Sequence, residues 1–497
     1  MHRIPDNTKQ MENKTDLKES TAKGFFWAAL SNGTQQIMTM VIGIIMANIL
    51  SVEDYGMVAM LTIFSTLAGN LQESGFTSAL CIKKEARHED FNSVFWFSTL
   101  VSLTLYGLLF FGAPFIARFN RSPELTLLGR IIFIGFFISS FGTAHAAYLF
   151  RNLMVREKTS SQVMAAVASG ITGLGTAIAG GGYWSLVVMD LTYKLTYTSL
   201  IWHFSPWRPT LHIDLHPALA MFSFSSRLLL TNMLTTLNNQ VLQSVLGHFY
   251  IQTQVGQYSQ ANKWSTMGGT LLTGMVGNVA QPVLASVNEE ENRQVRIFRK
   301  MLRFTAMLSL PALFGLGLIA PEFILLTIRE KWLPCVPYLQ TLCVGTAFIP
   351  LNQMFANLLI SKGQSNGYLI STTTFLALQL SAILLLHPYG IQPLLYTIAG
   401  LNIIWLLVWF AFARRFIHLS LRQVITDIAP FLTSAAIAIG SAAWTASFIA
   451  TPALSLVVKI AVAVIIYAAI MQITGIDIWK ECLNYVWKRC RKKRENK

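Results

Sequence analysis

The sequence predicts an all-α, polytopic membrane protein, and three observations support that fold class. Of the 497 residues, 53% are hydrophobic and only 12% are charged, whereas soluble domains carry about 25% charged residues. Apolar runs of about 20 residues recur along nearly the whole chain, and a run of that length crosses the hydrocarbon core as a helix. The runs are continuous and contain Gly and Ala, unlike the alternating strands of a membrane β-barrel, so helices are expected.

The apolar runs define about fourteen transmembrane helices. They are expected at residues 25–50, 57–80, 91–117, 125–150, 160–180, 183–203, 218–246, 256–285, 304–320, 335–360, 367–386, 389–413, 428–448 and 453–473. The longest internal loop, residues 203–217, has 15 residues and is too short for a catalytic domain. We therefore expect no enzyme activity, and we expect the function to reside among the helices.

Lys and Arg residues are distributed unequally between alternate loops. If the N-terminal tail is cytoplasmic, the cytoplasmic segments hold 29 of them and the opposite loops only four, Arg118, Arg121, Arg329 and Lys331. Because basic residues accumulate on the cytoplasmic side, both termini are expected there. The net charge of +15 then needs no nucleic-acid partner. The basic tail also carries an apolar stripe, so we expect it to contact anionic membrane lipids of the inner leaflet.

Short similarities in the same order predict an internal duplication. The Ala-Pro pair of GAPFIARFN at 112–120 recurs in IAPEFILLTI at 319–328, and YGMVAM at 55–60 corresponds to VGQYSQA at 255–261. A unit of six spans gives two parallel repeats related by an axis along the membrane normal. The predicted organisation is a tail at 1–24, a six-helix lobe at 25–203, a linker at 204–217, a second six-helix lobe at 218–413, two extra helices at 428–473 and a tail at 474–497.

Seven ionisable residues lie within the predicted spans, where charge is costly unless it is paired, hydrated or able to reach the interface. They are Arg130, Lys194, Arg227, Lys263, Lys459, Glu73 and Asp190. Asp190 and Lys194 are four residues apart on one helix and can pair. Arg130 and Lys459 lie near the outer ends of their spans and can snorkel to the interface.

Arg227 and Lys263 are predicted to line a central cavity. Arg227 lies about 15 Å from the inner end of its span, and Lys263 belongs to a polar series that a lipid-facing helix would not keep. Spans 1 and 7 add amides, for which interhelical hydrogen bonding is the alternative interpretation. The candidate substrate-binding residues are Lys263, Arg227, Lys194, Asn32, Gln35, Gln36, Asn239 and Gln240.

Glu73 and Asp190 are candidate coupling or pairing residues, and the sequence leaves both roles open. The five cysteines show no metal-ligand spacing, so no metal or cofactor is expected. The basic residues outnumber the acidic ones in the spans, and such a cavity favours an anionic cargo that bears a phosphate or pyrophosphate group.

Four segments resemble a known family. They are KGFFWAALSNGTQQI at 23–37, ANILSVEDYGMVAML at 47–61, ESGFTSALCIKK at 73–84 and VGQYSQANK at 255–263. These segments are similar to the polysaccharide transporter branch of the multidrug/oligosaccharidyl-lipid/polysaccharide exporter superfamily, the Wzx-type flippases, and the resemblance covers about residues 20–480. It implies alternating access of two lobes without ATP. It also implies transport of an undecaprenyl-pyrophosphate-linked oligosaccharide across the bacterial inner membrane, for O-antigen, capsule or exopolysaccharide biosynthesis.

The chain departs from part of the family pattern. In the related lipid II flippases, basic residues of the first and eighth spans face the cavity, whereas here only the eighth span supplies one, Lys263. An acidic residue often found late in the seventh span is replaced by Gln240 and Gln243, which puts cation coupling there in doubt. The resemblance makes polysaccharide polymerase and chain-length proteins candidate partners.

Two other functions remain as alternatives. A cation-coupled multidrug exporter of the same superfamily would need membrane carboxylates, and the spans contain only Glu73 and Asp190. A membrane-embedded polysaccharide polymerase would generally need a sizeable loop with carboxylates or basic residues. Both are less consistent with the sequence than a flippase.

Overall fold

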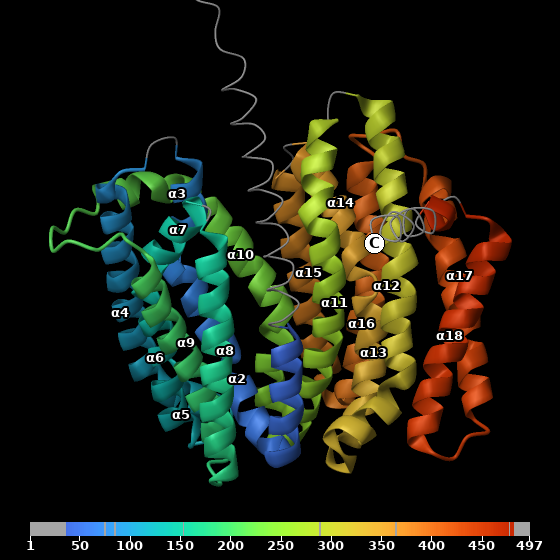
Figure 1. The fold of residues 1–497 in the computed structure, drawn as a ribbon, viewed down its shortest axis with the longest axis horizontal. Coiled ribbons are helices and arrows are strands. Elements are labelled where there is room, and N and C mark those ends of the chain that lie inside the picture. Colours follow the sequence, from blue (N-terminus) through green and yellow to red (C-terminus); the bar gives the residue numbers. More distant parts are fainter. Residues whose placement is uncertain are drawn as a thin grey trace, which may run out of the picture. The chain divides into compact units, whose positions relative to one another are not determined.

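A computed structural model describes residues 36–73, 76–83, 86–152, 154–287, 290–362, 365–476 and 478–481. Within these ranges the secondary structure is helical and includes no strand (Figure 1). The first helix is Gln36–Ile49. It is followed by α2 (Val52–Glu73), α3 (Phe76–Ile82), α4 (His88–Phe119), α5 (Leu125–Ile132), α6 (Ile134–Ser140), α7 (Thr143–Arg151), α8 (Val155–Ile178), α9 (Trp184–Phe204), α10 (His216–Phe249), α11 (Gln252–Ser286), α12 (Glu291–Ile328), α13 (Val336–Thr346), α14 (Ile349–Ser361), α15 (Ser365–Leu386), α16 (Ile391–Ala413), α17 (Leu421–Ala446) and α18 (Pro452–Thr474), with short 3₁₀ helices at Glu330–Cys335 and His387–Tyr389. The predicted all-α architecture is confirmed.

Many of the helices satisfy the length and apolarity of a membrane span. Among the described residues, eight do so singly, and the bent pair Leu125–Ser140 with Thr143–Arg151 makes a ninth. The other predicted spans coincide with Gln36–Ile49, α2 with α3, α9, α10 and α11. The chain is therefore a multi-pass membrane protein, and about fourteen spans account for its helices.

Two predicted spans are interrupted, which the apolar runs did not predict. The predicted span 125–150 bends by 41° before α7, where Gly142 packs close to Ile201. The predicted span 335–360 divides into α13 and α14, and Pro350 lies in the first turn of α14. Proline has no backbone N–H to donate and is favoured at helix starts, so the break falls there.

The chain forms two compact units, with the boundary between Val255 and Gly256. The first unit includes the helices up to α10, and the second includes most of α11 and all helices after it. The predicted lobe bounds, which assign residues 218–413 to the second lobe, remain a prediction.

In the first unit, α8 and α9 pack side by side, and α10 packs along α2. The segment after α9 is fixed to α4. The Asn92 amide donates to the carbonyl of His212 at 2.6 Å, and the Trp96 indole donates to that of Thr210 at 2.8 Å. Trp207 is buried in an aromatic cluster with Phe91 and Phe95. The predicted linker 204–217 is therefore anchored to this unit along part of its length.

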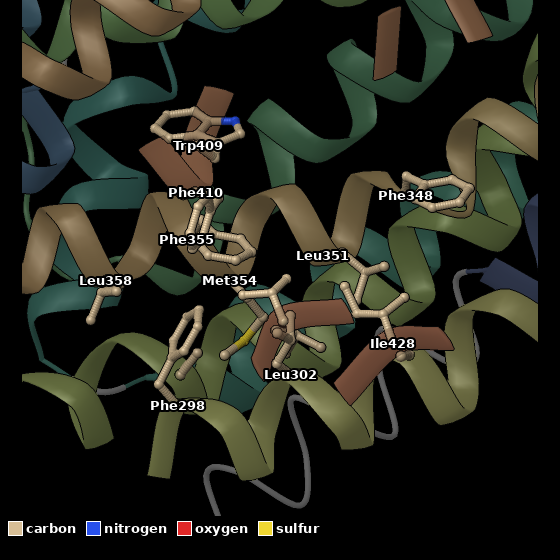
Figure 2. Close-up of a cluster of buried hydrophobic side chains, with 14 of the residues drawn as sticks. Phe298, Leu302, Phe348, Leu351, Met354, Phe355, Leu358, Trp409, Phe410 and Ile428 are labelled. Atoms are coloured by element: carbon tan, nitrogen blue, oxygen red, sulfur yellow. The ribbon is translucent and has the colours of Figure 1, made fainter. Parts of the chain in front are cut away.

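The core of the second unit surrounds α12. Phe298 and Leu302 of α12 lie among Met354 and Phe355 of α14, with Ile428 of α17 beside them (Figure 2). Helices α17 and α18, at the red end of the colour scale in Figure 1, pack side by side. Both also pack on α12, so the last two helices are an integral part of the second unit.

The start of the predicted C-terminal tail packs on this core. After Gly475, which has a positive φ of 64°, Ile478 is buried against the core cluster. The Lys300 ammonium lies 2.5 Å from the Glu481 carboxylate. The rest of the predicted lipid-binding stripe, residues 482–497, lies outside the described residues.

Candidate functional site

Lys263 lies on α11 as a partly buried cation. Its Nζ is 5.8 Å from the ring centroid of its neighbour Trp264. In the described part of the chain, no carboxylate lies within ion-pair distance of this ammonium. A cation in a membrane helix without an acidic neighbour favours an anionic ligand, which is the property predicted for this position.

The opposite side of α11 is fixed by packing. Trp264 meets Phe323 of α12 edge to face, with ring centroids 5.0 Å apart. The Ser265 and Thr346 hydroxyls are 2.8 Å apart. A Cβ on Gly269 would lie only 2.6 Å from the Thr346 methyl group, so glycine permits this close approach. Because packing holds this side of α11 in place, the other side has a defined position. That side carries the exposed Thr266 and the partly buried Asn262 and Lys263.

Lys194 and Asp190 of α9 form the predicted pair. The ammonium lies 2.7 Å from the Asp190 carboxylate, and the two side chains are 22% and 38% exposed. The pair lies against Gly135 of α6, where a Cβ would be 2.8 Å from Lys194 Nζ and 3.3 Å from Asp190. The pairing is confirmed, and it neutralises Lys194, so a role for this residue in binding substrate stays a proposal.

Polar residues of α10, which corresponds to the seventh predicted span, contact α2. The Thr66 hydroxyl donates to Gln240 Oε1 at 3.4 Å, and the Asn70 amide donates to the Thr236 hydroxyl at 2.7 Å. Interhelical hydrogen bonding, the alternative interpretation of this polar series, therefore describes Gln240. Asn239 is exposed and is the more accessible amide of the two.

The other candidates are less defined. Gln36 is partly buried in the helical segment Gln36–Ile49, and Glu73 is exposed at the end of α2. Arg227 belongs to α10, but its side chain lies outside the described part of the structure, as do Asn32 and Gln35 entirely. Among the described residues, no group of three or more His, Cys, Asp or Glu is placed to hold a metal ion.

The snorkelling interpretation of Lys459 is wrong. Its Nζ lies 2.6 Å from Glu322 Oε1 on α12, and the two side chains are only 12% and 13% exposed. The second basic residue interpreted in this way, Arg130, packs on Phe110 of α4 and donates to its carbonyl at 3.3 Å. The predicted span 304–320 ended before Glu322, whereas α12 continues through it to Ile328.

A buried ionic cluster was missed by the sequence analysis. Asp427 on α17 is fully buried and accepts from two α12 residues, Arg299 and Arg303. The three residues fall just outside the predicted spans 304–320 and 428–448, so they were counted with the loops. The four-residue spacing of the two arginines on one helix was the available signal.

These features define a multi-pass, all-α membrane protein whose helices carry several neutralised charges, and in which Lys263 has no acidic neighbour among the described residues. Residues 45–337 match the family model described as polysaccharide biosynthesis protein. The chain belongs to this polysaccharide biosynthesis protein family.

Three relatives have similar sequences over most of their length. The teichuronic acid biosynthesis protein TuaB of Bacillus subtilis is 24% identical over 70% of this chain and 73% of its own. The lipopolysaccharide biosynthesis protein WzxC of Escherichia coli is 22% identical over 70% and 71%. The succinoglycan biosynthesis transport protein ExoT of Rhizobium meliloti is 25% identical over 68% of each.

Two solved structures share the fold. The lipid II flippase MurJ, in an inward closed conformation, has a TM-score of 0.70 and 13% identity, covering 90% of this chain and 99% of its own. A multidrug resistance MATE family transporter has a TM-score of 0.61 and 17% identity over 77% and 94%. At these identities the likeness shows the fold alone. Together with the family, it makes this chain a transporter or flippase rather than an enzyme.

Proposed function

We propose that the chain moves a lipid-linked oligosaccharide, carried on undecaprenyl pyrophosphate, from the inner to the outer leaflet of the bacterial inner membrane by alternating access. The observation that carries this proposal is Lys263, a partly buried cation without an acidic neighbour in the described part of the structure. A pyrophosphate supplies the negative charge that such a cation favours.

The distribution of charge supports an anionic cargo. Asp190 is engaged by Lys194, and Glu322 by Lys459, so these two acidic groups are not available to a cationic substrate or a coupling cation. The biosynthetic roles named for TuaB and WzxC, and the lipid II named for MurJ, agree with a cargo of this class. The proposed topology has both termini in the cytoplasm, and the candidate partners remain a polysaccharide polymerase and chain-length proteins.

Replacing Lys263 tests the proposal. Lys263→Ala should reduce surface polysaccharide at least about tenfold, because one lost charge-assisted hydrogen bond costs about 1.5–3 kcal/mol. Lipid-linked oligosaccharide should accumulate on the inner leaflet, and the amount of protein in the membrane should be unchanged. Lys263→Arg retains the charge and should retain much of the export.

Thr266→Ala is the comparison for the loss of charge. Thr266 is exposed one helical turn later on α11 and carries no charge, so its replacement should reduce export less than Lys263→Ala does. Normal export by Lys263→Ala at a normal membrane level would contradict the assigned role of Lys263. A drug-exporter function predicts a different outcome, in which deletion of the protein increases sensitivity to cationic drugs and leaves surface polysaccharide intact.

A further inference from the structure

The ionic cluster between α12 and α17 has a fixed geometry. Arg299 donates to Asp427 through two nitrogens, Nε at 2.7 Å and Nη2 at 3.0 Å, and Arg303 donates through Nε at 2.5 Å. The Asp427 side chain is 0% exposed, whereas Arg299 and Arg303 keep 24% and 34% of their side-chain surface accessible. The carboxylate is therefore enclosed, and both arginine side chains stay partly accessible.

The cluster contains one more positive charge than Asp427 can neutralise. The two-nitrogen contact of Arg299 already pairs the buried carboxylate, and breaking such a pair would be costly. Arg303 adds a second guanidinium beside the first, at the cost of repulsion between like charges. By contrast, Glu322, which is also on α12, pairs with a single cation, Lys459 of α18. One cation is enough to join the two helices through Asp427. The second guanidinium is therefore available to bind another anion.

The two arginines also have donors left to offer. Nη1 of Arg299 and both terminal nitrogens of Arg303 have no acceptor in the described part of the chain. A guanidinium presents its N–H groups in a planar fork that matches phosphate oxygens. Because Asp427 holds both forks in place, little side-chain entropy is lost when an anion binds.

The predicted span bounds lead us to expect the cluster at the level of the lipid headgroups. Arg299 and Arg303 directly precede the apolar part of α12, predicted at residues 304–320, and Asp427 directly precedes that of α17, predicted at 428–448. Next to these residues in the sequence, Leu302 and Ile428 belong to the apolar core of the second unit (Figure 2). An anion at this depth is most readily supplied by a membrane lipid.

We propose that Arg299 and Arg303, held by Asp427, form a binding site for the phosphate group of a membrane lipid. Such a phosphate has two sources, the headgroup of an anionic phospholipid or the phosphate of a polyprenyl carrier. The site is separate from Lys263 and needs neither the proposed cargo nor the proposed direction of transport.

Lipid binding to the purified full-length protein in detergent tests the site, with native mass spectrometry to count bound molecules. The probes are phosphatidylglycerol, polyprenyl phosphate and, as a zwitterionic reference, phosphatidylcholine. Arg303→Gln leaves the Arg299 pair with Asp427 intact and should weaken binding of the anionic lipids about tenfold relative to phosphatidylcholine, whose choline offsets the charge of its phosphate. That is the loss expected for charge-assisted hydrogen bonds. Arg303→Lys keeps the charge but lacks the planar guanidinium group. Its lipid binding should lie between that of the wild type and that of Arg303→Gln.

The matched control is Arg293→Gln, which removes the same charge from the same helix at an exposed position paired with Glu290. It should leave lipid binding within about twofold of the wild type. Loss of polyprenyl phosphate alone would assign the site to the carrier, and loss of both anionic lipids would assign it to general phospholipid.

Two results would overturn the site. One is unchanged binding by both Arg303 variants, and the other is an equal loss in Arg303→Gln and Arg293→Gln, which would indicate unspecific attraction. Lys263→Ala should bind phosphatidylglycerol normally, because this lipid is not the cargo proposed for Lys263. Phosphatidylglycerol binding therefore reports on the arginine site alone, and surface polysaccharide in Lys263→Ala reports on the proposed function, so the failure of either proposal is distinguishable from the failure of the other.

Discussion

Lys459 of α18 and Glu322 of α12 form a nearly buried ion pair, with 2.6 Å between Nζ and Oε1. The Ser455 hydroxyl also donates to this carboxylate at 2.9 Å, and Lys459 donates to the carbonyl of Leu318 at 3.3 Å. Asp427 of α17 bonds the other half of α12 through Arg299. The last two helices are thus each joined to α12 by an ionic contact.

Removing one partner of the Lys459 pair should destabilise the protein. Lys459→Met leaves Glu322 with an unpaired carboxylate and should lower the free energy of unfolding by about 3 kcal/mol. The double variant Glu322→Gln with Lys459→Met removes both charges and should lose less. Thermal unfolding in detergent measures both. A double variant less stable than the single one would show that the two groups do not act as a pair.

Exchanging Asp190 and Lys194 should leave export intact. The two residues neutralise each other on α9, and the exchanged pair, Asp190→Lys with Lys194→Asp, restores the same contact. Surface polysaccharide in cells carrying the exchange is the measurement, and Lys194→Asp alone is the comparison that breaks the pair. Loss of export by the exchanged variant at a normal membrane level would give one of these residues a direct role in transport.

Gly56→Ala should weaken the contact between α2 and the start of α11. A Cβ at position 56 would lie 2.1 Å from the Gln252 carbonyl oxygen, a backbone atom, so one helix must move, at a cost of about 1–3 kcal/mol. Gly69→Ala on the same helix is the control, because nothing lies within 4 Å of its added Cβ, and it should be neutral or slightly stabilising. Equal melting temperatures for the two variants would contradict this contact.

The hydrogen bond from Thr253 to Glu53 should make stability depend on pH. The Thr253 hydroxyl donates to Glu53 Oε1 at 2.7 Å, and this bond is the main reason that the pKa of Glu53 lies below its ordinary value. A carboxylate with a lowered pKa contributes stability above its unfolded pKa, and the contribution is lost as the pH falls through the folded value.

Thr253→Ala should therefore be less stable than the wild type near neutral pH and should converge with it in acid. Thr253→Ser retains the hydroxyl and should follow the wild type throughout. Thermal unfolding across this pH range is the measurement. If Thr253→Ala stays equally less stable than the wild type at low pH, the loss of stability does not come from the hydrogen bond to ionised Glu53.

Local spacing predicted some contacts and missed others. Asp190 and Lys194 are four residues apart on one helix, so their pairing follows from helix geometry. Glu322 and Lys459 are 137 residues apart, and Arg299 and Asp427 are 128 apart. No spacing rule relates such residues, because their contact depends on which faces of α12, α17 and α18 pack together.

The sequence by itself determined that this chain is a helical, multi-pass membrane protein. Hydrocarbon cannot satisfy backbone polar groups, so an apolar run of about 20 residues has to form a helix whatever surrounds it. Only the tertiary structure decided how charges that lie far apart in the sequence are neutralised. It paired Lys459 with Glu322 and enclosed Asp427 between two arginines, while Lys263 was left with no acidic partner in the part of the chain that is described. A charge is neutralised by whatever neighbour packing brings within a few ångströms, and packing joins residues from distant parts of the chain.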